Sequence, residues 1–335
     1  MSIGKIDWKV KESLDPHQKY VDDGSLADLY NDKICLTNRV RPNTLWLPML
    51  ADSCPNPPLL RKEEFVTFCE GLDHPEGLAF DSDGQLWAGG ELGQLYRISP
   101  AGQLTEVTRL GGFCLGLTFS PAQQLWVCNS GLHSLMRVDR SGRVLQSIES
   151  AGPTRLTTPN FSVFDHQDNL YFSDSGVWDG QNGFIYRLRP SGAVDRFAGP
   201  FAFANGLALS SDDRFLYVAE SQRDCVRRIE IRADGAAGET EIYAGALARI
   251  PDGLALDAAG NLYVACYASD CIYRVSLDRN VTLLAFDPEG TRIARPTNLA
   301  FGGSRLEDLY VANLGRWHIG RVHLDVRGQP LINFS

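Results

Sequence analysis

Six similar segments of the chain begin at one equivalent position, and four of the six residues there carry an oxygen suited to a hard cation. In chain order the six residues are Glu76, Leu115, Asn160, Asn205, Asp252 and Thr297. Carboxylate and amide oxygens are the ligands that Ca²⁺ prefers, and two carboxylates balance the charge of a divalent ion. Burying such groups together is costly unless something satisfies them. The sequence therefore predicts that Glu76, Asn160, Asn205 and Asp252 hold one divalent metal ion.

A simpler interpretation of three of these positions is a turn. Glu76, Asn205 and Asp252 are each followed by Gly, and Asp-Gly and Asn-Gly pairs are common in turns. The recurrence of oxygen-bearing residues at one position of the repeat favours the metal site instead. Because Ca²⁺ takes six to eight oxygen ligands, four protein ligands leave positions for water or substrate, as in a catalytic site. We expect Ca²⁺, and Mg²⁺, Mn²⁺ and Zn²⁺ remain alternatives.

The elements that position these residues repeat with the period of a propeller blade. The six starting points lie 39, 45, 45, 47 and 45 residues apart, which is the spacing of four-stranded blades. Each copy has an apolar strand, a polar turn and an aromatic-rich strand, as in DGLALDAAGNLYVAC from Asp252. A third strand follows in all six copies and a fourth in the first five. We therefore predict an all-β fold, a six-bladed β-propeller of four-stranded blades.

The sixth copy lacks a fourth strand of its own. The segment EEFVTFCEG at 63–71 alternates like a strand and precedes the first blade, so we expect it to complete the last blade. Closure of this kind leaves no open sheet edge in the ring. The first strand of each blade then lines the central channel and places the six opening residues in a ring near its mouth. The propeller is predicted to span residues 63–335.

Residues 1–62 lie outside the repeat and are richer in Pro and in charges of both signs. We expect them to form an extension that wraps the propeller or contacts a partner. A second copy of the chain is one such partner, so the extension also offers a route to a homo-oligomer.

Composition narrows the class of protein. The net charge of −9 disfavours a nucleic-acid partner, because binding to phosphates needs a positive surface. We expect no membrane partner, since no stretch reaches about 20 apolar residues and the first residues lack the apolar core of a signal peptide. Eight scattered cysteines without a CxxC pair are typical of thiols in a reducing compartment. The predicted partner is a small-molecule substrate, and the predicted location is the cytoplasm.

The segments around the four oxygen-bearing residues resemble the metal-binding segments of the SMP-30/gluconolactonase/luciferin-regenerating-enzyme family. They read HPEGLAFD, TPNFSVFD, FANGLALS and IPDGLALD, and the resemblance covers about residues 64–325. It implies a six-bladed propeller with one divalent metal in the channel, often Ca²⁺, and hydrolysis of lactones. It also implies that the quartet supplies the metal ligands and that Asp252 is the general base or the nucleophile.

The chain departs from this family pattern around the third blade. Gluconolactonases carry an Arg two residues before the blade-three Asn and an Asp directly after it, whereas this chain has Thr158 and Phe161. Thr158 is too short to replace the five donors of an Arg, and Phe161 offers no acceptor. We expect these two residues, with Phe113 and Asp174, to line the substrate pocket. The alternative for Phe161 is that it points into the blade core, in which case its identity does not bear on the substrate. Such an apolar wall favours a substrate with fewer hydroxyls than a sugar-acid lactone.

A metal-dependent hydrolase of lactones or related esters is therefore the leading interpretation. The first alternative is phosphotriester hydrolysis, since the diisopropyl-fluorophosphatase branch uses a similar quartet of ligands. A lyase or condensing activity of the strictosidine-synthase type is weaker, because those propellers lack this metal set. A non-catalytic NHL-like binding propeller is disfavoured by the acidic charge and the oxygen-lined channel. A serine hydrolase is disfavoured because the sequence contains no GxSxG motif.

Overall fold

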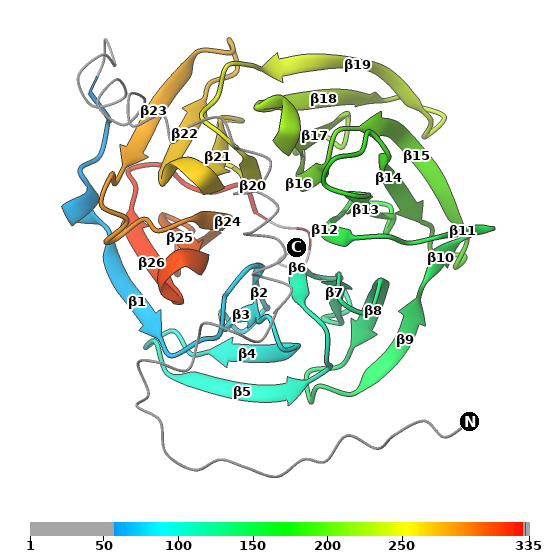
Figure 1. Ribbon diagram of the computed structural model, residues 1–335, viewed down its shortest axis with the longest axis horizontal. Coiled ribbons are helices and arrows are strands. Elements are labelled where there is room, and N and C mark those ends of the chain that lie inside the picture. Colours follow the sequence, from blue (N-terminus) through cyan, green and yellow to red (C-terminus); the bar gives the residue numbers. More distant parts are fainter. Residues whose placement is uncertain (1–56, 331, 333–335) are drawn as a thin grey trace, which may run out of the picture. The chain divides into compact units, whose positions relative to one another are not determined.

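The computed structural model describes residues 57–330 and residue 332. These residues form six four-stranded antiparallel sheets that surround a central axis as the blades of a propeller (Figure 1). The predicted all-β, six-bladed architecture is thus confirmed. Of the predicted extension over residues 1–62, only residues 57–62 belong to the described part, so its role stays a prediction.

In the first five blades the chain runs from the inner strand to the outer strand. Blades one to three contain, in this order, β2 (Leu78–Phe80), β3 (Leu86–Gly89), β4 (Gln94–Ile98) and β5 (Leu104–Arg109); β6 (Cys114–Phe119), β7 (Leu125–Asn129), β8 (Ser134–Val138) and β9 (Val144–Ile148); β12 (Pro159–Phe164), β13 (Leu170–Asp174), β14 (Gly183–Leu188) and β15 (Val194–Phe201). Blades four and five contain β16 (Ala204–Leu209), β17 (Phe215–Glu220), β18 (Cys225–Ile231) and β19 (Ala237–Ala244); β20 (Pro251–Leu256), β21 (Leu262–Cys266), β22 (Cys271–Val275) and β23 (Val281–Phe286).

Blade six is assembled from both ends of the described chain. Its inner three strands are β24 (Pro296–Gly302), β25 (Asp308–Asn313) and β26 (His318–His323), and its outer strand is β1 (Val66–Glu70). Strand β1 pairs antiparallel with β26, and Figure 1 shows the two side by side at the seam of the ring. The predicted closure by the segment 63–71 is therefore confirmed. Just before it, the backbone amides of Leu59 and Leu60 donate hydrogen bonds to carbonyls of β23.

The few remaining elements are short. A two-stranded hairpin of β10 (Ser150–Ala151) and β11 (Thr154–Arg155) follows β9. The described residues also include four short 3₁₀ helices: η1 (Lys62–Glu64), η2 (Ser221–Arg223), η3 (Tyr267–Ser269) and η4 (Leu314–Arg316). No helix in the described part of the chain has the length and apolar character needed to cross a membrane.

The hydrophobic core is divided among the six contacts between neighbouring blades. Each of six apolar clusters takes its members from two adjacent blades, as in the cluster that includes Tyr217 of blade four and Leu262 of blade five. Burying a side chain of this size contributes roughly 1.5–3 kcal/mol, so the contacts between blades hold the ring together. Six cysteines also lie in this interior as free, buried thiols: Cys69, Cys114, Cys128, Cys225, Cys266 and Cys271.

Candidate metal centre

The predicted ring residues lie at equivalent points on the inner strands, which surround the axis in Figure 1. In blades two to six the first residue of the inner strand pairs with the last residue of the second strand, and the ladder then shifts register. The ring residue is the second residue of the strand, so it lies within this bulge. β-Bulges are common beside active sites because they redirect a side chain. In blade one, Glu76 lies two residues before β2.

The glycines after the ring residues lie within strands, where the backbone of the next blade leaves no room for a side chain. Asn205-Gly206 lies inside β16 and Asp252-Gly253 inside β20. A Cβ added to Gly206 would lie 2.2 Å from the backbone oxygen of Asp252, and one added to Gly253 would lie 2.5 Å from that of Thr297. Each glycine thus lets an inner strand approach the ring residue of the next blade. The turn interpretation of these two pairs is wrong.

Two serines fix the orientation of the ring amides. Asn160 Nδ2 donates to Ser175 Oγ at 3.0 Å, and Asn205 Nδ2 donates to Ser221 Oγ at 3.2 Å. Each serine hydroxyl in turn donates to a carbonyl of the next inner strand, Ser175 to Ala204 at 2.6 Å and Ser221 to Pro251 at 2.7 Å. The serines therefore connect blades three, four and five at the level of the ring.

These contacts determine whether the oxygen or the nitrogen of each ring amide is available to bind a cation. A serine hydroxyl has one proton, and here it is given to a backbone carbonyl. The hydroxyl must then accept from the amide, which places the NH₂ group at the serine. The Oδ1 atom of Asn205 is left buried without a hydrogen-bond partner among the described residues. A buried acceptor without a partner costs about 1–3 kcal/mol, and a cation would satisfy it.

The two ring carboxylates influence each other. Burial raises the pKa of Glu76 well above its usual range, and the nearby charge of Asp252 raises that pKa further. Burial also raises the pKa of Asp252 well above its usual range, while the amide of Asn205 lowers it. Two buried carboxylates in mutual repulsion retain a proton unless positive charge is supplied. A divalent cation supplies such charge, so the donor set fits the predicted metal.

The residues at the other two ring positions are poorer ligands for a cation. Leu115 is apolar, and Thr297 Oγ1 donates to the backbone carbonyls of Pro75 and Glu76, both at 3.3 Å. Thr297 therefore helps to hold Glu76 in place. The oxygen-bearing quartet is contributed by blades one, three, four and five.

Two of the predicted pocket residues are engaged with backbone groups. The Asp174 carboxylate accepts hydrogen bonds from the amides of Thr157 at 2.8 Å and Thr158 at 2.5 Å. Thr158 Oγ1 donates to the carbonyl of Gly176 at 2.8 Å. Glu220 and Asn313, at the corresponding ends of β17 and β25, also accept amides from the entry loops of their blades. These contacts give Asp174 a role in holding the loop that leads to Asn160.

The two predicted aromatic residues lie at different levels. Phe161 is only 8% exposed and belongs to the apolar cluster between blades three and four, with Tyr171 and Phe197. Phe113 is also 8% exposed and directly precedes β6, and its carbonyl accepts the amide of Ser130 at 2.9 Å. Phe113 thus lies on the entry loop of its blade, whereas Phe161 has a packing role between blades. Contact of either ring with substrate stays a prediction.

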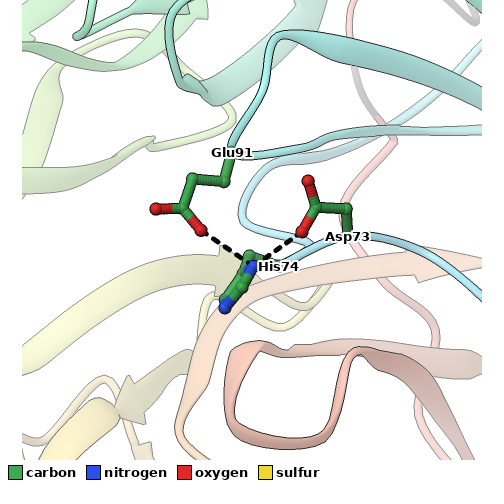
Figure 2. A group of neighbouring side chains, drawn as sticks. All are labelled: Asp73, His74 and Glu91. Carbon is green, nitrogen blue, oxygen red and sulfur yellow. Dashed lines mark hydrogen bonds and ion pairs between the residues drawn. The ribbon is translucent and has the colours of Figure 1, made fainter. Parts of the chain in front are cut away.

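A second group of candidate metal ligands comprises Asp73, His74 and Glu91, whose ligand atoms lie within 4.8 Å of one another. Figure 2 shows His74 Nδ1 between the two carboxylates, 2.7 Å from Asp73 Oδ1 and 2.9 Å from Glu91 Oε2. Burial lowers the pKa of His74, but the two carboxylates raise it more strongly, to about 9. The imidazole is therefore held as the cationic partner of the two carboxylates. The imidazole also packs 4.5 Å from the Trp317 ring of blade six.

Several residues near the ring were not predicted from the sequence. Ser175 and Ser221 directly follow the last residue of the second strand in successive repeats, a recurrence that an alignment of the repeats displays. Tyr267 holds the corresponding position in blade five, and Arg295 precedes Thr297 by two residues. Burial raises the pKa of Tyr267 to about 12, and the charges of Glu76 and Asp252 contribute to that rise. Tyr267 therefore lies within electrostatic reach of both ring carboxylates.

A family model described as "SMP-30/Gluconolactonase/LRE-like region" matches residues 114–314, which is more than half of the chain. The chain belongs to this family. The resemblance inferred from the four ring segments is thus confirmed. A second model, described as "Strictosidine synthase-like, N-terminal", matches residues 60–98.

Individual relatives are more distant. A gluconolactonase of Zymomonas mobilis is 28% identical over 187 residues, covering 50% of this chain and 51% of the relative. Lactonase drp35 of Staphylococcus haemolyticus is 28% identical over 216 residues, covering 59% and 64%. The chain thus spans about half to two thirds of the length of these relatives. The calcium-binding protein regucalcin of Agrobacterium tumefaciens shares the fold, with a TM-score of 0.70 at 18% identity over 84% of this chain and 100% of that one.

Proposed function

We propose that this protein is a divalent-metal-dependent hydrolase that opens lactones or related esters, with Ca²⁺ held by Glu76, Asn160, Asn205 and Asp252. The buried Oδ1 atom of Asn205, which has no hydrogen-bond partner among the described residues, carries this proposal. Two raised carboxylate pKa values at the same ring support it. Relatives named gluconolactonase and lactonase support the choice of reaction.

The four proposed ligands have different roles in the reaction. A bound divalent ion supplies positive charge that polarises the substrate carbonyl. Asn160 and Asn205 present neutral oxygens, and Glu76 contributes charge without a role in proton transfer. Asp252 activates water as a general base or attacks the carbonyl itself.

We further propose that the preferred substrate carries fewer hydroxyls than a sugar-acid lactone. Thr158 replaces a long donor-rich side chain, and its hydroxyl is already bonded to the carbonyl of Gly176. A polyhydroxylated lactone would leave several hydroxyls unpaired once water is expelled, at about 1–3 kcal/mol for each. An apolar lactone or ester avoids this loss.

The test is a substrate panel assayed with Ca²⁺ and with a chelator. The expected result is turnover of an apolar lactone that the chelator abolishes and that added Ca²⁺ restores. Activity indifferent to the chelator, together with no bound divalent ion in the purified protein, would contradict the proposal. If the protein hydrolyses a phosphotriester in a chelator-sensitive way but hydrolyses no lactone, it is a metal-dependent phosphotriesterase instead. A higher kcat/KM for D-glucono-1,5-lactone than for every apolar lactone would contradict the substrate preference alone.

A further inference from the structure

A second cleft lies on blade six, at the seam where β1 pairs with β26 (Figure 1). Its volume is 470 Å³, within the range of about 300–1,000 Å³ that is typical of small-molecule sites. Three segments of the chain form its walls: β1, the loop between β23 and β24, and the segment that runs from η4 into β26. The polar residues that line it include Thr67, Glu70, Thr291, Arg292, Arg316 and His318. None of the four proposed metal ligands lines this cleft, so it is a separate site.

Two arginines bring positive charge to this cleft. Arg292 and Arg316 are both exposed, and neither forms an ion pair with a carboxylate of the described residues. Arg292 Nη1 donates to Thr67 Oγ1 at 3.4 Å, and Arg316 Nε donates to the carbonyl of Gly290. A guanidinium has five N–H donors. Most donors of both side chains are therefore available to a ligand.

The turn that begins at Asp287 holds both arginines in place. Asp287 Oδ2 accepts the backbone amide of Arg292 at 2.5 Å, and the carbonyl of Arg292 accepts Nε2 of His318 at 3.2 Å. Gly290, which holds the side chain of Arg316, donates its amide to the carbonyl of Asp287 at 2.9 Å. The two cations are thus positioned before a ligand arrives, which lowers the entropy lost on binding.

The hydroxyls and the imidazole of the cleft differ in what they offer an anion. Thr67 Oγ1 accepts from Arg292, so its own proton is available to a ligand oxygen. Thr291 Oγ1 donates to Asp287 Oδ2 at 3.0 Å. Burial lowers the pKa of His318 below its ordinary value, so this imidazole is uncharged at neutral pH. The charge that an anion meets in the cleft therefore comes from the arginines.

One carboxylate also lines the cleft. Glu70 is exposed and forms no ion pair with a described residue. Its single negative charge opposes the binding of an anion, but the two guanidinium groups outnumber it. The cleft thus has a net positive charge on a protein whose overall charge is −9.

We infer that this cleft binds the phosphate group of a small phosphate monoester between Arg292 and Arg316. Such a phosphate carries about two negative charges at neutral pH and has three acceptor oxygens. These match two guanidinium forks and the Thr67 hydroxyl, whereas a carboxylate carries one charge and is satisfied by one fork. The volume of 470 Å³ leaves room for the organic part of the ester. The inference does not rest on the proposed function.

The experiment measures binding of three probes to the full chain by titration calorimetry: phenyl phosphate, inorganic phosphate and acetate. A chelator is present throughout, so no divalent ion contributes an anion site of its own. We expect both phosphates to bind at one site, and acetate to bind at least tenfold more weakly. Binding of inorganic phosphate without binding of phenyl phosphate would indicate an adventitious ion only and would overturn the inference.

Three variants test whether this cleft is the site. Arg292→Gln and Arg316→Gln should each weaken the binding of phenyl phosphate at least tenfold, because charge-assisted hydrogen bonds are the strong ones. Glu70→Gln removes the opposing charge and should tighten binding at least twofold, a gain that a folding defect does not produce. Undiminished affinity in both arginine variants, or weaker binding in Glu70→Gln, would overturn the inference.

Arg327→Gln is the matched control. Arg327 is also exposed and lies outside the cleft, so this variant makes the same change of charge elsewhere on the surface. It should bind phenyl phosphate within twofold of the wild type. A loss equal to that of Arg292→Gln would mean that the overall charge, and not the cleft, controls binding, which would overturn the inference.

The result is independent of the proposed reaction. Calcium-dependent lactone turnover without binding of phenyl phosphate would refute the inference alone. Binding of phenyl phosphate that depends on Arg292 and Arg316, without turnover of any lactone or ester, would refute the proposed function alone.

Discussion

Asn205 and Ser221 are joined by a hydrogen bond of 3.2 Å in which the amide is the donor and the hydroxyl the acceptor. The hydroxyl can only accept because its own proton is bonded to the carbonyl of Pro251 at 2.7 Å. The amide oxygen of Asn205 is thereby directed away from the serine and left without a protein partner. A residue outside the ligand set thus determines which atom of Asn205 is presented.

The first prediction concerns this pair. Ser221→Ala removes the acceptor that orients Asn205, so the amide can rotate and the affinity for Ca²⁺ should fall. Loss of a partner that orients a metal ligand typically lowers affinity 10–100-fold, and we expect about tenfold here. The affinity is measured by titration calorimetry with the purified variant.

Ser130→Ala is the control for this prediction. Ser130 follows the last residue of β7 as Ser221 follows that of β17, but the ring residue of blade two is Leu115. The control should keep the wild-type affinity for Ca²⁺. An equal loss in both serine variants, or no loss in Ser221→Ala, would show that the serine does not orient a ligand.

The fold was predictable because the repeat is local. Each blade packs apolar side chains of its strands against the next blade, so the same alternating pattern of apolar residues recurs once in every blade. The closing strand β1 was predictable from the missing fourth strand of the last repeat. The hairpin of β10 and β11 was not predicted, because two residues per strand are too few for an alternating pattern.

The equivalent positions of the ring residues on the inner strands were also predictable, whereas the contacts around them were not. The repeat period alone aligns the four oxygen-bearing residues at one position, and their shared function as metal ligands stays a prediction. The role of Gly206 depends instead on its 2.2 Å approach to the backbone oxygen of Asp252 in the next blade, and sequence spacing does not report such distances. The contact between Arg295 and Tyr267 likewise joins blades six and five, so neither residue stands out within its own repeat.

The second prediction separates binding from chemistry at the ring. Asn205→Ala removes a neutral ligand, so activity should fall and be partly recovered at high Ca²⁺ concentration. Asp252→Asn keeps the size of the side chain but removes its charge and its basicity, so activity should stay low at every Ca²⁺ concentration. Steady-state rates over a Ca²⁺ titration measure both effects. Equal recovery of the two variants by Ca²⁺ would argue against a catalytic role of Asp252.

The third prediction concerns the spacing of the inner strands. Gly206→Ala places a Cβ 2.2 Å from the backbone oxygen of Asp252, so β16 and β20 must move apart. We expect unfolding to require about 2 kcal/mol less free energy, as is typical of overpacking, together with weaker Ca²⁺ binding. Urea unfolding with and without Ca²⁺ measures both.

Gly245→Ala is the control for that variant. Its Cβ would meet only Ile242 Cγ2, at 3.5 Å, so the wild-type unfolding curve should be retained. A Gly206→Ala protein that matches this control in both stability and Ca²⁺ affinity would show that the strands have room for a larger residue.

The last prediction concerns the loop that leads to Arg295. Asp287 is fully buried, and its Oδ2 atom accepts backbone amides of Thr291 at 2.7 Å, Arg292 at 2.5 Å and Ile293 at 3.1 Å. Burial raises the pKa of Asp287, but these hydrogen bonds outweigh it and lower the pKa from 3.8 to about 2. The folded state therefore binds a proton less readily than the unfolded state.

The stabilisation from Asp287 should thus be complete above about pH 4 and disappear as the pH falls towards 2, and its size is about 2 kcal/mol. Asp287→Asn should unfold at lower urea concentration than the wild type at pH 5, with a smaller gap at pH 2.5. Asp325→Asn is the control, because Asp325 is exposed to solvent and its replacement should leave the unfolding curve unchanged at both pH values. A gap between Asp287→Asn and wild type that stays the same at both pH values would mean that the charge of Asp287 does not stabilise the loop.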